Sequence, residues 1–292
     1  MWGEKLYYSI LTGIGSMTYY LDKKLYHLTG KEFKTPKPDK KFMSMFMGFV
    51  DGDGYIEIGP QKQYTKSDNI AKSTIRARLV IRLHSRDQYF LTYLTQVLGV
   101  GSISSLDSTN QTRLIFSKKD LTTVILPLIK QYGLQFLTAN RSNQFALLNY
   151  IIDNNIVHWD DVNFTSSFSG FSVKDLLNFN FFANWLVGFT IAEGSFGVKG
   201  KGEAFFQIKQ KGIENYNLIK AICAPPVGGE PNIKPDYSNS YQLTLSSKAD
   251  VQKVFNFFSA SDTNLYGYKL TQYNEWLVYL KTSKRYKDII PY

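Results

Sequence analysis

The sequence predicts an α+β protein made of two pseudo-symmetric half-domains. Each is ordered helix-strand-strand-helix-strand-strand-helix around a four-stranded antiparallel sheet. Three observations predict this fold. An apolar, helix-like segment occurs twice, as F-M-G-F-V-D-G-D-G (46–54) and L-V-G-F-T-I-A-E-G (186–194). A stretch with alternating apolar side chains follows each copy, at 74–84 and 204–211. Finally, S-K-K-D-L at 117–121 returns as S-K-A-D-V at 247–251. The repeat distance, 193 − 53 = 140 residues, is the size of a domain.

Composition shifts along the chain divide it into four parts. We expect an N-terminal extension over 1–41, a first half-domain over 42–153, a polar linker over 154–178 and a second half-domain over 179–292. The extension ends in the basic, Pro-containing stretch K-T-P-K-P-D-K-K, which is typical of a connection. A cleavable leader is disfavoured there because Glu4 and Asp22 are acidic and arginine is scarce.

The two apolar segments predict a pair of helices that pack closely on each other. Small residues four apart lie on one stripe of a helix and let another backbone come near. The stripe residues are Gly48, Gly52, Gly188 and Ala192. Asp53 and Glu193 stand in the last turn of each helix, just before a glycine. If the helices cross about a pseudo-two-fold axis, we expect both acids to lie side by side at one end of the crossing.

The remaining elements follow in the same order in both halves. The first half predicts strands at 55–58 and 74–84, a helix at 87–99, strands near 103 and 112–116, and helices at 117–132 and 140–153. The second predicts strands within 196–211, a helix at 214–223, an irregular connection at 225–235, a strand at 241–245 and further helices. R-S-N-Q-F at 141–145 returns as K-L-T-Q-Y at 269–273.

The charge balance points to a polyanionic partner. Lys and Arg number 34 against 24 Asp and Glu, a net charge of +10, which favours nucleic acid or an anionic surface over a neutral partner. A basic protein with a solvated lysine surface is the alternative. The most apolar run, 176–192, is interrupted by three asparagines and closed by Glu193, so it predicts a buried helix and no membrane span. Cys223 is the single cysteine, which excludes an intrachain disulfide and a cysteine-based zinc site.

The two nine-residue segments resemble the LAGLIDADG motif of homing endonucleases and intron maturases. The resemblance covers roughly 42–285, with both matches followed by strand-like sequence in a basic chain. It implies a monomeric, two-repeat, intron-encoded enzyme whose two sheets form a DNA-binding saddle. Such an enzyme makes a metal-dependent double-strand break at a specific site in a long DNA target, by phosphodiester hydrolysis.

The resemblance also designates a catalytic centre. Asp53 and Glu193 are the implied Mg²⁺ ligands, and two adjacent carboxylates repel each other until a divalent ion relieves the repulsion. We add the preceding residues, Gly52 and Ala192, to the metal site, and expect Mn²⁺ or Ca²⁺ to substitute in binding. Asp51 is matched by Ile191 in the second copy, so we expect it to cap or hydrogen-bond locally.

Further catalytic candidates follow from the family's habit of placing a glutamine and lysines around the metal. They are Gln210, Lys118 and Lys248. Leu83 stands at the position of Gln210 in the first half, so the two halves would not be equally competent. For the two lysines, a solvated residue at a helix start is the alternative.

The outward sheet faces and hairpin turns supply the expected DNA contacts. An alternating strand with arginines on one face offers a cationic surface that can reach phosphates and guanine edges, with DNA shape contributing as well. The candidates are Arg76, Arg78, Arg82, Lys62, Gln63, Lys199, Lys201, Gln207, Lys209, Lys211, Gln242 and Thr244.

Three alternative functions stay open. An intron RNA maturase would keep the fold and basic surface without needing both acids, and a protein with both activities is possible. An intein-embedded nuclease is disfavoured because the chain lacks a starting Cys or Ser and a closing His-Asn. A DNA binder without nuclease activity is separable only by assay. Abundant Tyr, Phe, Asn, Ile and Lys suit an AT-rich gene of a mitochondrion or another organelle.

Overall fold

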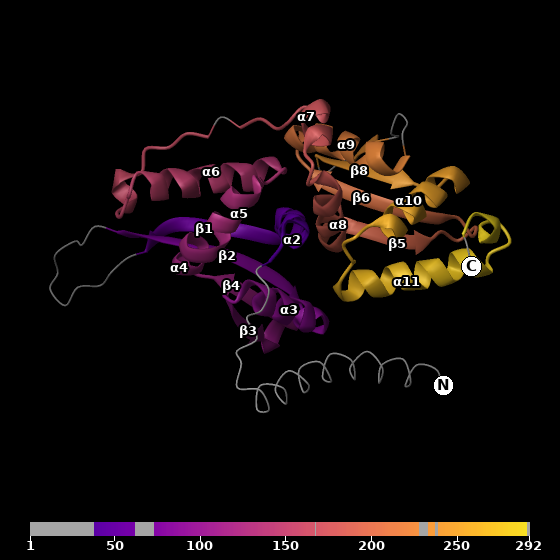
Figure 1. The fold of residues 1–292 in the computed structure, drawn as a ribbon, viewed down its shortest axis with the longest axis horizontal. Helices are drawn as coiled ribbons and strands as arrows, with labels where there is room; N and C mark the ends of the chain where they lie inside the picture. Colours follow the sequence, from indigo (N-terminus) through magenta and orange to yellow (C-terminus); the bar gives the residue numbers. More distant parts are fainter. Residues whose placement is uncertain (1–37, 62–72, 167, 228–232, 237–238, 291–292) are drawn as a thin grey trace. The chain divides into compact units, whose positions relative to one another are not determined.

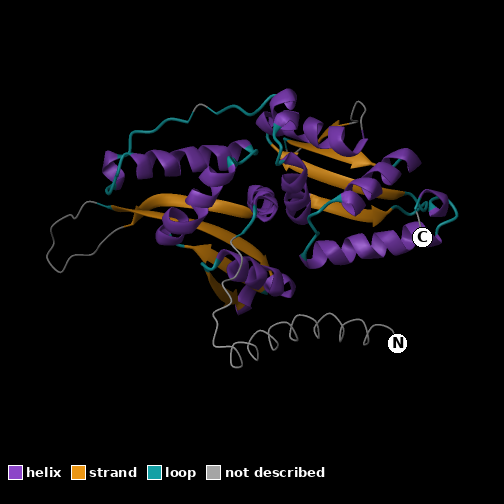
Figure 2. Cartoon of the chain, in the orientation of Figure 1, coloured by secondary structure: helices purple, strands orange, loops and turns teal. Residues whose placement is uncertain are grey.

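The predicted architecture is confirmed: a computed structural model contains two half-domains, each with a four-stranded antiparallel sheet (Figure 1). The structure describes residues 38–61, 73–166, 168–227, 233–236 and 239–290. The strand orders are β1-β2-β4-β3 and β5-β6-β8-β7, so the second strand of each half is central. Figure 2 shows helices flanking the strands in both halves. Among the described residues, no helix is long and apolar enough to cross a membrane.

The first half-domain follows the predicted order. Its elements are α2 (Lys40–Asp53), β1 (Gly54–Gln61), β2 (Thr74–His84), the 3-10 turn η1 (Ser85–Asp87), α3 (Gln88–Leu98), β3 (Ser102–Leu106), β4 (Gln111–Phe116), α4 (Lys118–Asp120), α5 (Leu126–Tyr132) and α6 (Ala139–Asp153). The helix expected over 117–132 is interrupted by a π-helical turn, Leu121–Ile125. Pro127 follows this turn and has no N–H to donate to the helix, which favours such irregularity.

The second half-domain repeats the pattern after the linker. Its elements are α7 (Val173–Asn178), α8 (Phe182–Glu193), β5 (Gly194–Val198), β6 (Ala204–Lys211), η5 (Ile213–Asn215), α9 (Tyr216–Val227), β7 (Ile233–Asp236), β8 (Ser240–Leu245), α10 (Lys248–Ala260) and α11 (Gly267–Thr282). Two expected boundaries were wrong. α9 continues past Cys223, and β7 begins inside the segment expected to be irregular because Ile233 pairs with Leu243. The linker also contains α7 and a bridge from His158 to Thr74.

The helices α2 and α8 cross at the centre of the fold. Asp39 caps α2 by accepting a hydrogen bond from the Phe42 N–H at 2.7 Å, so the helix starts two residues before the predicted Phe42. A Cβ built on Gly48 would overlap the Trp185 carbonyl, and a Cβ on Gly188 would overlap that of Met45. These contacts are related by the 140-residue repeat, so the predicted two-helix interface is confirmed.

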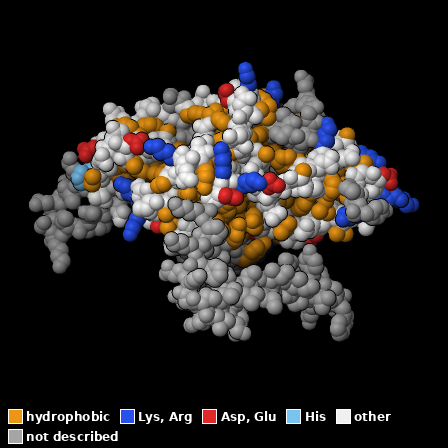
Figure 3. All heavy atoms as spheres, viewed as in Figure 1, with side chains coloured by type: hydrophobic (Ala, Val, Ile, Leu, Met, Phe, Trp, Pro, Cys, Tyr) orange, Lys and Arg blue, Asp and Glu red, His pale blue; other side chains and the backbone are white. Residues whose placement is uncertain are grey.

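Each sheet has one buried and one outward face. In β2, the apolar Ile75, Ala77, Leu79 and Ile81 are buried, while Arg76, after the first of them, and Arg82, after the last, are exposed. In β6, Ala204, Phe206 and Ile208 are buried in the same alternation. Hydrophobic burial therefore sets the register, and the polar side chains of both sheets face outward. On the face seen in Figure 3, Lys and Arg side chains are dispersed among apolar and acidic ones.

Candidate active site

Asp53 and Glu193 end the two crossing helices and lie close together. A Cβ built on Gly52 would be 3.1 Å from Cγ of Glu193. Each helix turns directly into a strand at a glycine, and Gly54 N–H donates to the Val50 carbonyl as Gly194 N–H does to Thr190. Neither glycine has a positive φ. A Cβ on Gly54 would instead lie 2.8 Å from Val50 Cγ1. Close packing therefore explains why a glycine follows each acid.

The two acids are electrostatically strained. Burial, and then the nearby charge of Glu193, raise the pKa of Asp53 to about 7. Burial also raises the pKa of Glu193 above its usual value. Two half-buried carboxylates that resist ionising together need a cation to become fully charged.

Two basic side chains approach these acids from α6 and α11. Lys269 donates to the Gly194 carbonyl and, at 2.9 Å, to Gln272 Oε1. Arg141 donates through Nε to the Val50 carbonyl at 3.3 Å and through Nη1 to Gln144 Oε1 at 2.9 Å. Both lower the pKa of Glu193, and Lys269 also lowers that of Asp53. Sequence reasoning did not place them in the site, although the repeated basic-x-x-Gln at 141–144 and 269–272 was the available signal.

Lys118 and Lys248, the lysines expected beside the metal, have other named neighbours in the structure. Lys118 lines a hollow with Arg76 and Arg78 on the outward side of the first sheet. Lys248 Nζ is 4.0 Å from Asp288. Neither is among the charges that act on Asp53 or Glu193. Each lysine starts the helix after the fourth strand, whereas the basic side chains that act on the acids come from α6 and α11. The roles of Lys118 and Lys248 at the metal stay predictions.

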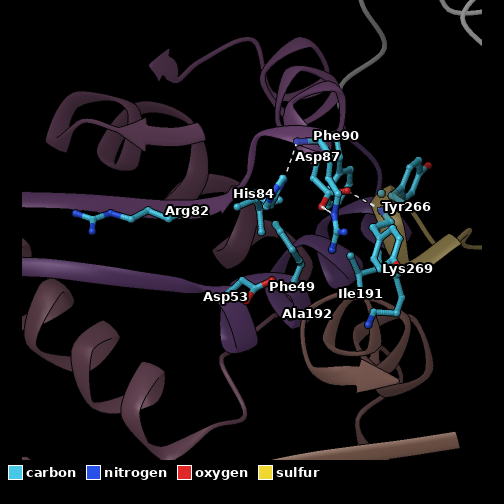
Figure 4. A pocket seen from close by; sticks show the side chains of 14 residues that line it. Phe49, Asp53, Arg82, His84, Asp87, Phe90, Ile191, Ala192, Tyr266 and Lys269 are labelled. Carbon is cyan, nitrogen blue, oxygen red and sulfur yellow. Dashed lines mark hydrogen bonds and ion pairs between the residues drawn. The ribbon is translucent and has the colours of Figure 1, made fainter. Parts of the chain in front are cut away.

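Gln210 is half-buried on β6, and its Oε1 accepts from the N–H of Lys211 at 3.3 Å. Its first-half counterpart, Leu83, lines a cavity of about 270 Å³ beside Asp53. Arg82, His84, Asp87 and Lys269, which Figure 4 labels, also line this cavity. The surroundings of the two acids therefore differ, one having an apolar side chain where the other half has an amide.

Asp51 does not act locally as expected. The side chain is 2% exposed and accepts four hydrogen bonds. The donors are Leu137 N–H (2.8 Å), Thr138 N–H (3.1 Å), the Thr138 hydroxyl (2.6 Å) and the Trp185 indole (2.7 Å). Burial, only partly offset by these donors, raises its pKa to about 6. Asp51 is therefore a structural carboxylate that ties α2 to α8 and to the start of α6.

The donor set of the acid pair fits a hard divalent cation. Within the described part of the chain, no three or more His, Cys, Asp or Glu side chains gather at a metal-binding distance. Asp53 and Glu193 thus offer two carboxylates and no nitrogen or sulfur ligand. Mg²⁺ is commonly held by one or two carboxylates plus water and phosphate oxygens, and Ca²⁺ also prefers oxygen.

The outward face of the first sheet carries the predicted arginines and residues that were missed. Glu57 Oε2 is 2.5 Å from Arg78 Nε, and Glu57 Oε1 is 3.4 Å from Arg76 Nη1. Arg82 lies opposite Arg113 in the β2–β4 register. Sequence reasoning missed Glu57 and Arg113 because the sequence of one strand does not show which residues of the neighbouring strand lie opposite it. Lys62 and Gln63 lie outside the described residues.

In the second sheet, the predicted DNA-contacting residues lie opposite one another on β6 and β8. Gln207 is opposite Thr244, and Lys209 is opposite Gln242. The amide of Gln242 donates to the Thr244 hydroxyl at 3.0 Å. Three candidates are exposed at the ends of β6 and in the turn before it, namely Lys199, Lys201 and Lys211.

Comparisons with known proteins agree with this geometry. A family model described as LAGLIDADG endonuclease matches residues 46–152 and 186–280. The chain is 24% identical over 249 residues to an uncharacterized cox1 intron-2 37.2 kDa protein of Schizosaccharomyces pombe, covering 82% of this chain and 66% of that protein. It is 25% identical over 230 residues to a probable intron-encoded endonuclease aI3 of Dictyostelium citrinum, covering 75% of this chain and 86% of that protein.

Solved structures share the fold. I-SmaMI bound to an uncleaved DNA target in the presence of calcium ions superposes with a TM-score of 0.64 at 19% identity, covering 85% of this chain and 94% of that one. The LAGLIDADG homing endonuclease I-LtrWI bound to target DNA gives a TM-score of 0.64 at 17% identity, with coverages of 86% and 96%.

Proposed function

Since the chain belongs to the LAGLIDADG endonuclease family, we propose that it is a site-specific homing endonuclease. It makes a divalent-metal-dependent double-strand break in a long DNA target, hydrolysing one phosphodiester bond in each strand. The observation that carries the proposal is the meeting of Asp53 and Glu193, one from each half, at the end of a helix crossing. An acid from each half supplies one reaction centre per strand of a duplex held by two sheets.

Asp53 and Glu193 would hold Mg²⁺, with the backbone carbonyls of Gly52 and Ala192 as further oxygen donors. A divalent ion bound there lowers the pKa of a water molecule and neutralises charge on the scissile phosphate. Mn²⁺ or Ca²⁺ would occupy the same oxygen ligands. The crystallised I-SmaMI complex with calcium ions and uncleaved DNA supports such a site by analogy.

The basic side chains would stabilise negative charge that develops on the phosphate. Lys269 and Arg141 are each held by a backbone carbonyl and a glutamine side chain, so their donors are oriented before substrate arrives. Gln210 would orient a water molecule near Glu193. Its counterpart near Asp53 is Leu83, whose apolar side chain cannot hydrogen-bond water. The two centres would then cut at unequal rates.

The outward sheet faces would grip the duplex. In the first sheet, Arg76, Arg78, Arg82 and Arg113 would reach phosphates and guanine edges. In the second sheet, the polar rows at 207–211 and 242–244, with the turn lysines Lys199 and Lys201, would do the same. We infer that the protein acts as a monomer, since both halves of the saddle lie in one chain. The intron-encoded relatives support an organellar, mitochondrial location.

The test is cleavage of a randomised duplex library by the purified protein with Mg²⁺, beside an EDTA control and the Asp53→Asn variant. Metal-dependent cutting at one long site, lost in the variant while duplex binding persists, is the expected result. Absence of cutting by the wild type, together with tight and salt-sensitive binding to a structured intron RNA, would overturn the proposal in favour of a maturase.

A further inference from the structure

The start of α11 is held by a carboxylate from the other half-domain. Asp87, in the turn after β2, accepts a hydrogen bond from the Tyr268 N–H at 2.6 Å. The helix's own preceding residue, Tyr266, makes no side-chain cap. Gly267 has a φ of 64°, and a Cβ there would lie 2.6 Å from Asp87 Oδ1. An orphan N–H of α11 is therefore satisfied from outside its own half.

Arg86 strengthens the same contact. Its guanidinium carbon lies 3.5 Å from the centre of the Tyr268 ring, and its Nε is 3.6 Å from Asp87 Oδ2. Figure 4 places Asp87 beside Tyr266, with Lys269 below them. Arg86 and Asp87, two consecutive residues of the first half, thus both contact the first turn of α11, immediately before Lys269.

A matching contact runs in the opposite direction. Asn215, in the turn after β6, accepts from the Ala139 N–H at the start of α6 at 3.0 Å. Its amide also donates to the Lys211 carbonyl at 2.7 Å, which fixes its orientation. Thr138, which precedes α6, uses its hydroxyl on Asp51 and makes no side-chain cap. The capped turn of α6 carries Arg141 two residues later.

We propose that these reciprocal caps are positioning devices of the active site. By capping α11, Asp87 fixes the position of Lys269, and by capping α6, Asn215 fixes the position of Arg141. Each basic side chain is therefore in place only when the two half-domains are docked. The inference rests on the proposed endonuclease function and assigns a role to two residues in the turns that follow the central strands. Neither needs to touch the DNA or a metal ion.

The two caps are chemically unequal. Asp87 brings a negative charge to its helix start, and Asn215 brings a neutral amide of similar shape. Asp87 is among the charges that act on both Asp53 and Lys269. The Asp87→Asn variant therefore separates the cap from the charge, because an amide oxygen can still accept the Tyr268 N–H.

The experiment measures cleavage of each strand separately, on a target duplex labelled on both strands, with excess full-length protein. Asp87→Ala and Asn215→Ala are each expected to slow cleavage about tenfold or more through misplacement of a basic side chain. Asn215→Ala should shift the ratio of the two strand rates, because Arg141 acts on Glu193 and is not among the charges that act on Asp53. Asp87→Ala should instead slow both strands, because Lys269 acts on both acids. Target affinity should change by less than about threefold, since neither substitution removes a cationic side chain that would contact a phosphate.

Controls distinguish positioning from general damage. Asp87→Asn should recover most of the rate lost in Asp87→Ala, and Ser172→Ala, which removes a cap of the remote α7, should cleave both strands normally. Equal slowing of both strands in Asn215→Ala, or affinity loss matching the rate loss in either alanine variant, would overturn the positioning role. A wild-type protein that cuts no DNA would instead refute the proposed function, before the variants are compared.

Discussion

The indole N–H of Trp185 donates a hydrogen bond to the carboxylate of Asp51 at 2.7 Å, joining the two central helices side by side. The same carboxylate receives two backbone N–H groups and a hydroxyl from Leu137 and Thr138. Each carboxylate oxygen therefore accepts two donors. One buried acid thus links α2, α8 and the start of α6, the helix that carries Arg141.

Replacing Asp51 with asparagine should destabilise the protein strongly. Either orientation of the amide turns its NH₂ group toward two donors, leaving buried groups unsatisfied. We expect a loss of about 2–4 kcal/mol in the free energy of unfolding, measured by urea denaturation at pH 8. Asp160→Asn, at an exposed position, is the matched control and should change the free energy by less than about 0.5 kcal/mol. A stable Asp51→Asn protein would contradict the structural role of this acid.

Alanine at Gly48 or Gly188 should prevent close approach of α2 and α8. Each new Cβ would overlap a backbone carbonyl of the partner helix, and backbone cannot move aside as a flexible side chain can. We expect a loss of about 3 kcal/mol or more per substitution, at the upper end for overpacking. Thermal denaturation checks this. Gly200→Ala is the control, because nothing lies within 4 Å of its Cβ position.

Without divalent ions, stability should fall as pH rises through the range in which Asp53 ionises. Its native pKa of about 7 lies above its ordinary value of 3.8. The native state therefore binds this proton more tightly than the unfolded state between pH 4 and 7, and that stability is lost as pH rises through 7. Asp51, with a pKa of about 6, adds to the same trend.

The Asp53→Asn variant isolates the contribution of Asp53. In EDTA at pH 8 it should be more stable than the wild type by about 1 kcal/mol or more, and the difference should vanish near pH 4. Adding Ca²⁺ or Mg²⁺ at pH 8 should raise the melting temperature of the wild type and not of the variant. Equal pH dependence in both proteins would show that Asp53 is not strained by Glu193 and burial.

Replacing Lys269 and replacing Lys248 should have different effects on cleavage. Lys269→Ala should lower the cleavage rate about a hundredfold with little change in target affinity, because its charge lies beside both acids. Lys248→Ala should leave the rate within about threefold, because exposed ion pairs such as that with Asp288 contribute little. Strand cleavage under single-turnover conditions measures both. A large loss in Lys248→Ala would restore the role that the sequence suggested for this residue.

The crossing of the two central helices could be predicted because the residues that form it are close together in the sequence and occur in two copies. The small-residue stripe, the terminal acid and the following glycine all lie within nine residues, so the helix crossing and the meeting of Asp53 with Glu193 follow from pattern alone. The alternation in β2 and β6 likewise predicts which side chains leave the core. These features depend on helix and strand periodicity, which contacts between distant residues seldom change.

The partners of Asp51 could not be predicted because they come from residues 86 to 134 positions away along the chain. The choice of Lys269 and Arg141 over Lys248 and Lys118 likewise depends on how α6 and α11 dock against the acids. The caps from Asp87 and Asn215 join turns to helices of the opposite half-domain. By itself, the sequence determined the repeat, the central helices, the acid pair and the polar sheet faces. Only the tertiary structure decided which cations and caps surround the acids, because hydrogen bonds between distant segments depend on three-dimensional packing and leave no periodic signal in the chain.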